Sequence, residues 1–227
     1  MNMDLDLSHI KCVIFDYGFT LSSGHYFNVP HPEIPNWNET IQKVIFSRSE
    51  IVEPWMNGEI SLFEIANIIA HETGVSSKEV LYCLRRGCVD LGFNKYVYEF
   101  ACWVRSTPLR SALVTMNMDV FSNVIIPSHG LDGLFDVIVN SAEAGTCDKT
   151  ILWPMAFESL GSHISYGNSL LIEDGEKHPA EFRNSGGVAY QYNNDQAFFH
   201  WLRDVNFGEN GQPAIQAYAK QQAPLNF

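Results

Sequence analysis

The stretch CVIFDYGFTL, residues 12 to 21, decides how the chain is interpreted. Four apolar residues, Cys12 to Phe15, lead without a break into Asp16. An unbroken apolar run predicts a strand that is covered on both faces, as in a parallel sheet. The residue after such a strand lies in the crevice at the carboxyl end of the sheet, where ligands bind. Asp16 is therefore a candidate site residue, although aspartate also commonly starts a turn.

The composition excludes several classes of protein. The chain has 227 residues, 46% of them hydrophobic, which is enough for one core and a small second unit. Its net charge of −12 disfavours a partner that is nucleic acid or an anionic membrane. The N-terminus lacks a basic signal-like region, and no apolar run is long enough to cross a bilayer. We therefore expect a globular cytoplasmic protein with free cysteines.

Four further apolar runs predict the rest of a parallel sheet. They are SALVT (111–115), DVIVN (136–140), SLLIED (169–174) and VAYQY (188–192). Helical patterns follow the last three of them, in the stretches KTILWPMAFESLG, AEFRNSGG and DQAFFHWLRDV. This alternation predicts an α/β fold with a Rossmann-like parallel sheet core.

The long interval between the first two strands predicts a separate helical unit, because one crossover helix would not fill it. Ser61 and Glu64 form a capping box ahead of LFEIANIIAHETG, which Gly74 ends. Ser76 and Glu79 repeat the device before VLYCLRRGCVDLG. A third helix, NKYVYEFACWVR, is expected to lead back to the sheet.

These patterns divide the chain into three parts. Residues 1–21 and 108–207 are expected to form the α/β core, and residues 22–107 an inserted α-helical cap domain. Residues 208–227, rich in Gln, Ala, Gly and Pro, are expected to be a C-terminal tail that frays or packs on the domain or a neighbour. The sequence leaves the oligomeric state open.

Four ordered segments resemble the motifs of the haloacid dehalogenase (HAD)-like hydrolase superfamily. IFDYGFTL is similar to its apolar strand with Asp-x-Asp-Gly-Thr-Leu, and ALVTMN to its strand ending in Ser or Thr. Lys149 stands where the family usually has Lys-Pro, and LLIEDGEKHPAEF is similar to its acidic strand end. The resemblance spans roughly residues 10 to 195. It implies the phosphatase-like branch with a helical cap between the first two motifs.

The resemblance implies phosphoryl transfer through an aspartyl-phosphate intermediate. Asp16 would be the nucleophile, since a carboxylate attacks without first losing a proton. Thr115 and Lys149 would act with it in catalysis and bind the phosphate, with Asn117 or nearby amides helping. Lys149 would also bind the nucleophile. The implied substrate is a small phosphorylated metabolite, whose identity the sequence does not give.

The same resemblance implies a Mg²⁺ cofactor, a hard cation that takes oxygen ligands. Asp16, the backbone carbonyl of Gly18 and Asp174 would bind the ion. Glu173 would act indirectly, by holding a metal-bound water or Lys149.

Gly18 departs from the family pattern. Most phosphatases of the family have a second aspartate here, which protonates the leaving oxygen and then activates water. General acid–base catalysis contributes about 10²–10⁴-fold, so glycine predicts slower turnover unless water, Tyr17, His25 or a cap residue replaces the acid. Some branches of the family carry Asp-x-Gly-x-Thr, so Gly18 does not by itself exclude activity.

Three alternative functions stay open beside phosphatase activity. A haloacid dehalogenase would use Asp16 on a carbon that bears halogen, but the acidic pair Glu173 and Asp174 argues against it. A phosphonatase tolerates a small residue at position 18 but needs a cap lysine, and no recognised motif supplies one. A non-catalytic phosphate-binding protein is favoured by Gly18 and opposed by the retained polar residues at the strand ends.

Overall fold

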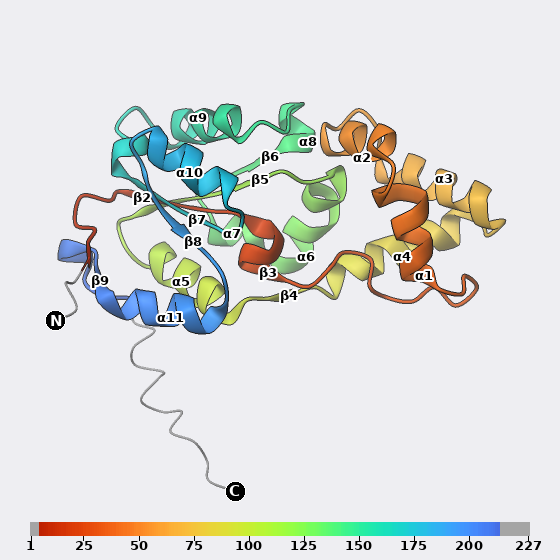
Figure 1. The fold of residues 1–227 in the computed structure, drawn as a ribbon, viewed down its shortest axis with the longest axis horizontal. Helices are drawn as coiled ribbons and strands as arrows, with labels where there is room; N and C mark the ends of the chain where they lie inside the picture. The colour runs from red at the N-terminus through yellow and green to blue at the C-terminus, as the bar shows by residue number, and fades with distance from the viewer. Residues whose placement is uncertain (1–4, 214–227) are drawn as a thin grey trace, which may run out of the picture.

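A five-stranded parallel sheet forms the centre of the molecule (Figure 1). The computed structural model describes residues 5–213, and within them the strand order of this sheet is β6-β5-β2-β7-β8. Its strands are β2 (Cys12–Phe15), β5 (Arg110–Thr115), β6 (Val137–Asn140), β7 (Ser169–Glu173) and β8 (Val188–Gln191). The predicted α/β fold with a parallel sheet is confirmed.

Helices cover both faces of this sheet (Figure 1). They are α9 (Lys149–Leu160) and α10 (Lys177–Asn184) on one face, and α5 (Lys95–Arg105) and α11 (Asp195–Asp204) on the other. Val13 and Phe15 belong to the hydrophobic cluster under α5 and α11, whereas Cys12 and Ile14 belong to the cluster under α9 and α10. The unbroken apolar run of β2 is thus explained by burial on both faces.

Short elements complete the core. A helical turn η1 (Tyr17–Leu21) follows β2, and η3 (Phe121–Ile125), α6 (Ile126–His129) and α7 (Leu131–Leu134) follow β5. After β6 and α9 come α8 (Ser141–Ala144) and η4 (Tyr166–Asn168). Near the ends of the described chain, β1 (Leu5–Asp6) pairs in parallel with β9 (Val205–Asn206).

A helical insert lies between β3 (Ser22–Ser23) and β4 (Gly92–Phe93), two short strands that pair with each other in antiparallel fashion. Its elements are α1 (Trp37–Ile41), the π-helical segment η2 (Gln42–Phe46), α2 (Ser49–Met56), α3 (Leu62–Thr73) and α4 (Ser77–Val89). The predicted helices α3, α4 and α5 are confirmed. The elements α1 and η2 are not predicted from the sequence.

The two predicted capping boxes differ in outcome. At the start of α3, Glu64 Oε2 accepts from Ser61 N at 2.7 Å, and Ser61 Oγ accepts from the Glu64 amide, so the first box is confirmed. At the start of α4, Ser76 makes no side-chain cap, so the second prediction is wrong. The reason is a tight first turn, because the Glu79 amide donates to the Ser76 carbonyl at 3.0 Å instead.

Helix α5 follows the insert in the sequence but packs on the sheet. The rings of Phe100 and Phe15 lie 5.7 Å apart, and Val97 and Val104 are buried in the same cluster. The predicted boundary at residue 107 stays a prediction. Because α5 covers the sheet, we propose that the division between insert and core lies near β4.

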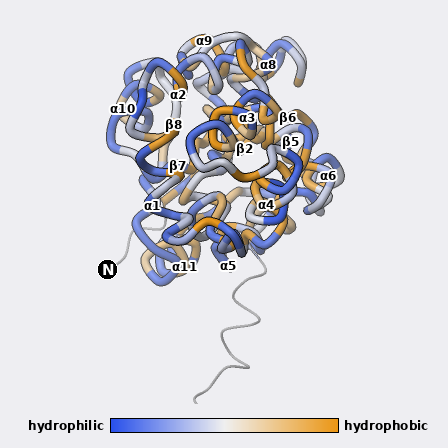
Figure 2. Tube along the Cα trace, turned by 90° about the vertical axis from the view of Figure 1, so that its right-hand side faces the viewer, coloured by the Kyte–Doolittle hydropathy of each residue, from blue (hydrophilic) through white to orange (hydrophobic). Residues whose placement is uncertain are grey.

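The distribution of apolar residues agrees with this architecture. Figure 2 shows hydrophobic residues along the central strands and hydrophilic residues on the outer turns. The five cysteines are all free, with Cys12, Cys83 and Cys88 buried, Cys147 half-buried and Cys102 exposed. None of the helices between residues 5 and 213 has the length and apolar character required to span a membrane. Of the predicted tail, η5 (Gly208–Asn210) is a short 3₁₀ turn, and residues 214–227 lie outside the described residues.

Candidate active site

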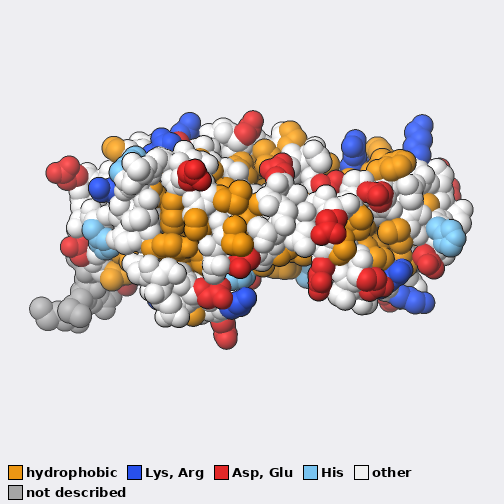
Figure 3. All heavy atoms as spheres, turned by 90° about the horizontal axis from the view of Figure 1, so that it is seen from above, with side chains coloured by type: hydrophobic (Ala, Val, Ile, Leu, Met, Phe, Trp, Pro, Cys, Tyr) orange, Lys and Arg blue, Asp and Glu red, His pale blue; other side chains and the backbone are white. Residues whose placement is uncertain are grey.

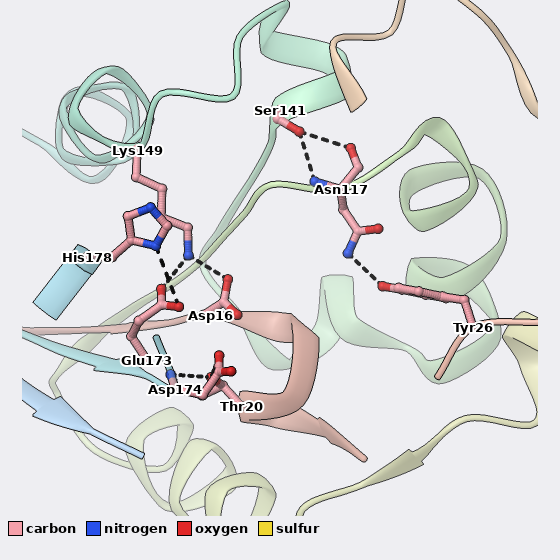
Figure 4. Close-up of polar contacts among 9 residues, drawn as sticks. All are labelled: Asp16, Thr20, Tyr26, Asn117, Ser141, Lys149, Glu173, Asp174 and His178. Atoms are coloured by element: carbon pink, nitrogen blue, oxygen red, sulfur yellow. Dashed lines mark hydrogen bonds and ion pairs between the residues drawn. The ribbon is translucent and has the colours of Figure 1, made fainter. Parts of the chain in front are cut away.

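Four of the predicted site residues meet at the carboxyl edge of the sheet (Figure 4). Asp16 follows β2, Glu173 ends β7, Asp174 comes directly after it, and Lys149 begins α9. The strands β2 and β7 are neighbours, with Phe15 opposite Ile172. Because parallel strands end at the same edge, the residues that follow them converge.

Lys149 is buried between two carboxylates. Its Nζ donates to Asp16 Oδ1 at 2.7 Å and also to Glu173 Oε2. The side chains of Lys149, Asp16 and Glu173 are 2%, 8% and 5% exposed. Burial lowers the pKa of a lysine, but the two carboxylates outweigh it and hold the pKa of Lys149 above its usual value. The amine is therefore a fixed positive charge within the site.

The carboxylates differ in how firmly they are ionised. Burial raises the pKa of Asp16 to about 7; Lys149 opposes the rise, and Glu173 and Asp174 add to it. Burial also raises the pKa of Glu173, but His178 and Lys149 more than offset it, and the pKa lies below its usual value. The nearest atoms of His178 and Glu173, Nδ1 and Oε1, are 3.7 Å apart. Glu173 is thus firmly anionic, whereas Asp16 binds a proton readily when no other cation is present.

Asp174 is fixed by the turn that follows β2. Thr20 Oγ1 donates to Asp174 Oδ1 at 3.0 Å and accepts from the Asp174 amide at 2.9 Å. Burial raises the pKa of Asp174, and Thr20 opposes that rise. Thr20 lies within the first motif, but the sequence alone does not predict this role for it. Its place four residues after Asp16, at the opposite end of the same turn, was the available signal.

The turn at Gly18 does not itself require glycine. Gly18 has φ −63° and ψ 126°, and Phe19 has φ 55° and ψ −8°, the angles of a type II turn. The left-handed position, which favours glycine, is therefore occupied by Phe19. A Cβ at Gly18 would meet nothing within 4 Å. A side chain at position 18 is thus sterically allowed.

Asn94 holds this turn in place. Its Nδ2 donates to the carbonyls of Phe19, Thr20 and Ser22 at 3.0, 2.8 and 3.2 Å. Asn94 directly follows β4, at the return from the insert to the core. The loop next to Asp16 is consequently tied to the base of the insert.

Thr115 ends the neighbouring strand β5, Asn117 follows it by two residues, and both are buried. Asn117 is bound to protein on three sides. Its backbone N donates to Ser141 Oγ at 2.8 Å. In its side chain, Oδ1 accepts from the Met118 backbone N at 3.1 Å, and Nδ2 donates to Tyr26 Oη at 2.6 Å. The structure therefore engages the Asn117 side chain with Tyr26 rather than with Asp16 or Lys149.

The insert rests on the core beside Asn117. Ser141 Oγ lies 2.7 Å from the Met56 carbonyl at the end of α2. Asp119 accepts from Trp55 Nε1 at 2.7 Å and from the Leu62 amide at the start of α3. These contacts bring the insert onto the segments that follow β5 and β6. Sequence reasoning missed Tyr26, Ser141 and Asp119, although Ser141 directly follows a predicted strand.

Two solved structures with the same fold carry the HAD name. A HAD family enzyme from Bacteroides thetaiotaomicron, in complex with magnesium and inorganic phosphate, is 16% identical and has a TM-score of 0.60, over 82% of this chain and 95% of that chain. A predicted HAD-like family hydrolase from Porphyromonas gingivalis is 17% identical, with a TM-score of 0.57 over 86% of this chain and 98% of that chain.

A dehalogenase shares the fold as well. The L-2-haloacid dehalogenase from Xanthobacter autotrophicus is 15% identical, with a TM-score of 0.57 over 92% of this chain and 88% of that chain. No family model and no curated protein matches the sequence. At these identities the comparisons establish the fold, and the chain has the HAD-like fold that the motifs predict.

Proposed function

We propose that this protein is a Mg²⁺-dependent HAD-like hydrolase, and that it is a phosphatase of a small phosphorylated metabolite. The observation that carries the proposal is the buried Lys149 between Asp16 and Glu173, with Asp174 beside them. One ammonium is set against three carboxylates, so the group retains negative charge. Such a group suits a divalent cation and, with it, a phosphate.

The donor atoms of the site fit Mg²⁺. One oxygen from each of Asp16, Glu173 and Asp174 lies within 4.8 Å of the others, and carboxylate oxygens are the ligands this ion prefers. Asp16 and Asp174 each bond to protein through Oδ1, and their Oδ2 atoms have no hydrogen-bond partner among the described residues. Both oxygens of Glu173 face basic side chains instead.

These contacts support the predicted division of roles. We propose that Asp16, Asp174 and the carbonyl of Gly18 hold Mg²⁺ and that Glu173 acts through Lys149. When bound, the ion would offset the negative charge that nucleophile and phosphate bring together.

The remaining chemistry falls to the chain itself. Asp16 attacks phosphorus, and the bond to the leaving oxygen breaks as the new bond forms. Lys149 keeps Asp16 oriented and offsets the charge of the phosphate, and Thr115 donates to a phosphate oxygen from the end of β5. Water then attacks the aspartyl phosphate, which releases phosphate and restores Asp16.

One feature supports a small substrate, and another supports a phosphate. The insert contacts the core through α2 and α3, which lie over the segments after β5 and β6, and such a cover limits what can enter. The surface is acidic, with acidic side chains spread over the face in Figure 3. Lys149 therefore supplies the local positive charge that a phosphate needs. The cytoplasmic location stays a prediction.

Dehalogenation is the second candidate, because dehalogenases are among the proteins with this fold. Its nucleophile would also be Asp16, acting on carbon. The cluster with Asp174 favours the phosphatase, since displacement of halide from carbon does not need a divalent cation.

One experiment separates these functions. Phosphate release from a panel of small phosphomonoesters is measured with Mg²⁺ and with EDTA, for the wild type and Asp16→Asn. Halide release from 2-chloropropionate is measured in parallel. Mg²⁺-dependent phosphate release that disappears in Asp16→Asn is the expected result. Metal-independent halide release without phosphate release would establish the dehalogenase, and neither activity across the panel would overturn both.

A further inference from the structure

Gly18 leaves the proposed reaction without a proton donor for the leaving oxygen. Two of the substitutes predicted from the sequence do not suit the task. The Tyr17 hydroxyl is buried without a hydrogen-bond partner among the described residues, and its ring packs edge-on against Phe121 with the centroids 4.8 Å apart. His25 is exposed and packs its ring against Phe19. The predicted substitutes that remain are water and another residue of the insert, and the insert offers one suitable side chain.

Tyr26 comes from the insert and has a hydroxyl hydrogen to give. The Asn117 amide is oriented by the Met118 amide, which donates to Asn117 Oδ1 at 3.1 Å. The other end of the side chain, Nδ2, must therefore be the donor in the 2.6 Å bond to Tyr26 Oη. Since the hydroxyl oxygen accepts in this bond, its own hydrogen is not used there. Tyr26 Oη has no other hydrogen-bond partner among residues 5–213.

The position of Tyr26 is set by the contact between insert and core. Asn117 N donates to Ser141 Oγ at 2.8 Å, and Ser141 Oγ lies 2.7 Å from the Met56 carbonyl of the insert. The hydrogen bonds that join the insert to the core at this point therefore converge on Asn117, the residue that also binds Tyr26.

The phenol faces the nucleophile. Figure 4 shows the Tyr26 hydroxyl directed toward the part of the site that contains Asp16, from the side opposite Lys149 and Glu173. Burial raises the pKa of Tyr26 well above its usual value, and the charges of neighbouring groups, Asp16 among them, add to the rise. The phenol therefore keeps its proton at neutral pH and is available as a donor.

We propose that Tyr26 is the proton donor to the leaving oxygen, in place of the acid that Gly18 lacks. The inference rests on the proposed phosphatase function. As the bond from Asp16 to phosphorus forms, the bond from phosphorus to the leaving oxygen breaks, and its electron pair stays on that oxygen. The oxygen takes the Tyr26 hydrogen, which leaves a tyrosinate that the Asn117 Nδ2 group stabilises by its hydrogen bond.

The second half-reaction restores the donor. The tyrosinate takes a proton from the attacking water while the water oxygen bonds to phosphorus and the bond to Asp16 breaks. Tyr26 is neutral again, and phosphate is free. The device matters most for alkyl phosphate monoesters, whose leaving alkoxide needs a proton. It matters little for esters whose leaving group is already stable as an anion.

The test compares Tyr26→Phe with the wild type on two substrates, the best alkyl phosphate from the panel and p-nitrophenyl phosphate. We expect kcat/KM for the alkyl phosphate to fall by about 10²–10⁴-fold, and that for p-nitrophenyl phosphate to fall by less than about threefold. Tyr82→Phe, at an exposed tyrosine of α4, is the matched control and is expected to leave both unchanged. Adding Gly18→Asp to Tyr26→Phe is expected to restore alkyl phosphate turnover.

The outcomes are distinguishable. An equal loss on both substrates assigns Tyr26 a positioning or structural role and overturns the inference, as does no loss on either. If the wild type releases phosphate from neither substrate, the proposed function fails first. If Tyr26→Phe does not fold, a series of esters on the wild type decides: a shallow dependence of rate on leaving-group pKa supports a proton donor, and a steep dependence overturns it.

Discussion

The two sides of the candidate site are built from different kinds of interaction. The charged side is the group Asp16, Lys149, Glu173 and Asp174. The neutral side is the group Tyr26, Met56, Asn117 and Ser141. The charged side comes entirely from the core, whereas the neutral side joins the core to the insert. The comparison teaches that the core alone assembles the charged residues, whereas the neutral side, which includes the proposed proton donor Tyr26, requires contact between the insert and the core.

The two sides also affect stability differently. Three carboxylates around one buried amine repel one another, so the charged side is held together at a cost that the rest of the core must offset. The neutral side consists of hydrogen bonds that each satisfy a buried polar group. Variants on the charged side are therefore expected to change activity most. On the neutral side, variants of Ser141 are expected to weaken the contact between the insert and the core.

The largest effect is expected for Asp16→Asn. Loss of the nucleophile should lower Mg²⁺-dependent phosphate release by at least about 10³-fold. The variant should remain folded in circular dichroism, with a melting temperature no lower than that of the wild type, because one of the repelling carboxylates is gone. A variant that keeps more than a tenth of the activity would remove Asp16 from the role of nucleophile.

Lys149→Met is expected to give the largest loss of stability. It leaves Asp16 and Glu173 buried without their partner, which costs about 3–5 kcal/mol when one member of a buried pair is removed. The free energy of unfolding is measured in urea at pH 7, with Lys78→Met at an exposed lysine as the control. Equal stability of the two variants would contradict the view that Lys149 holds the charged side together.

The pH dependence of stability distinguishes the charged side further. Without metal, the pKa of Asp16 is about 7 in the folded protein, against about 4 in an unfolded chain. The folded state thus holds the Asp16 proton more tightly than the unfolded state. The contribution of this proton to the free energy of unfolding is complete below pH 4 and is lost as the pH rises to about 7.

Asp16→Asn lacks this proton equilibrium and serves as the reference. In EDTA, the stability of the variant relative to the wild type should increase between about pH 4 and pH 7. The measurement is urea unfolding of both proteins across that range. A stability difference between the two proteins that does not vary with pH would show that Asp16 titrates normally. Mg²⁺ is expected to reduce the dependence of this difference on pH.

A smaller effect is expected on the neutral side from Ser141→Ala. The substitution removes the hydrogen-bond partner of the Asn117 backbone N–H and of the Met56 carbonyl. An unsatisfied buried polar group costs about 1–3 kcal/mol. We expect stability to fall by that amount and KM to change more than kcat for p-nitrophenyl phosphate. Ser159→Ala, at an exposed serine of α9, is the control. A loss confined to kcat would place Ser141 in the chemistry rather than in docking.

The same comparison explains what the sequence could predict. Cys12 to Phe15 predicted a strand buried on both faces, and Asp16, Glu173 and Asp174 follow from the rule that parallel strands end at one edge. Lys149 needed the family resemblance, because nothing in its local pattern sets it apart from a surface lysine. The charged side was therefore accessible from sequence.

The neutral side was not accessible in the same way. Tyr26 lies in an irregular loop that has no periodicity, and its partner Asn117 is 91 positions away. The helix α1 was missed because it is short and follows a proline-rich loop, and Asn36 before it makes no side-chain cap. The capping box predicted at Ser76 does not form, because the Glu79 amide donates to the Ser76 backbone carbonyl and not to the Ser76 side chain. Each of these depends on tertiary context that local patterns do not contain.

The hydrogen bonds of Asn94 to the turn after β2 connect the base of the insert to the site. One amide group gathers three carbonyls of the segment that also carries Thr20, and it stands where the chain returns from the insert. Lifting the insert therefore pulls on the very backbone that aligns Asp174 through Thr20. The contact between insert and core and the alignment of the acidic residues are therefore linked through the side chain of Asn94.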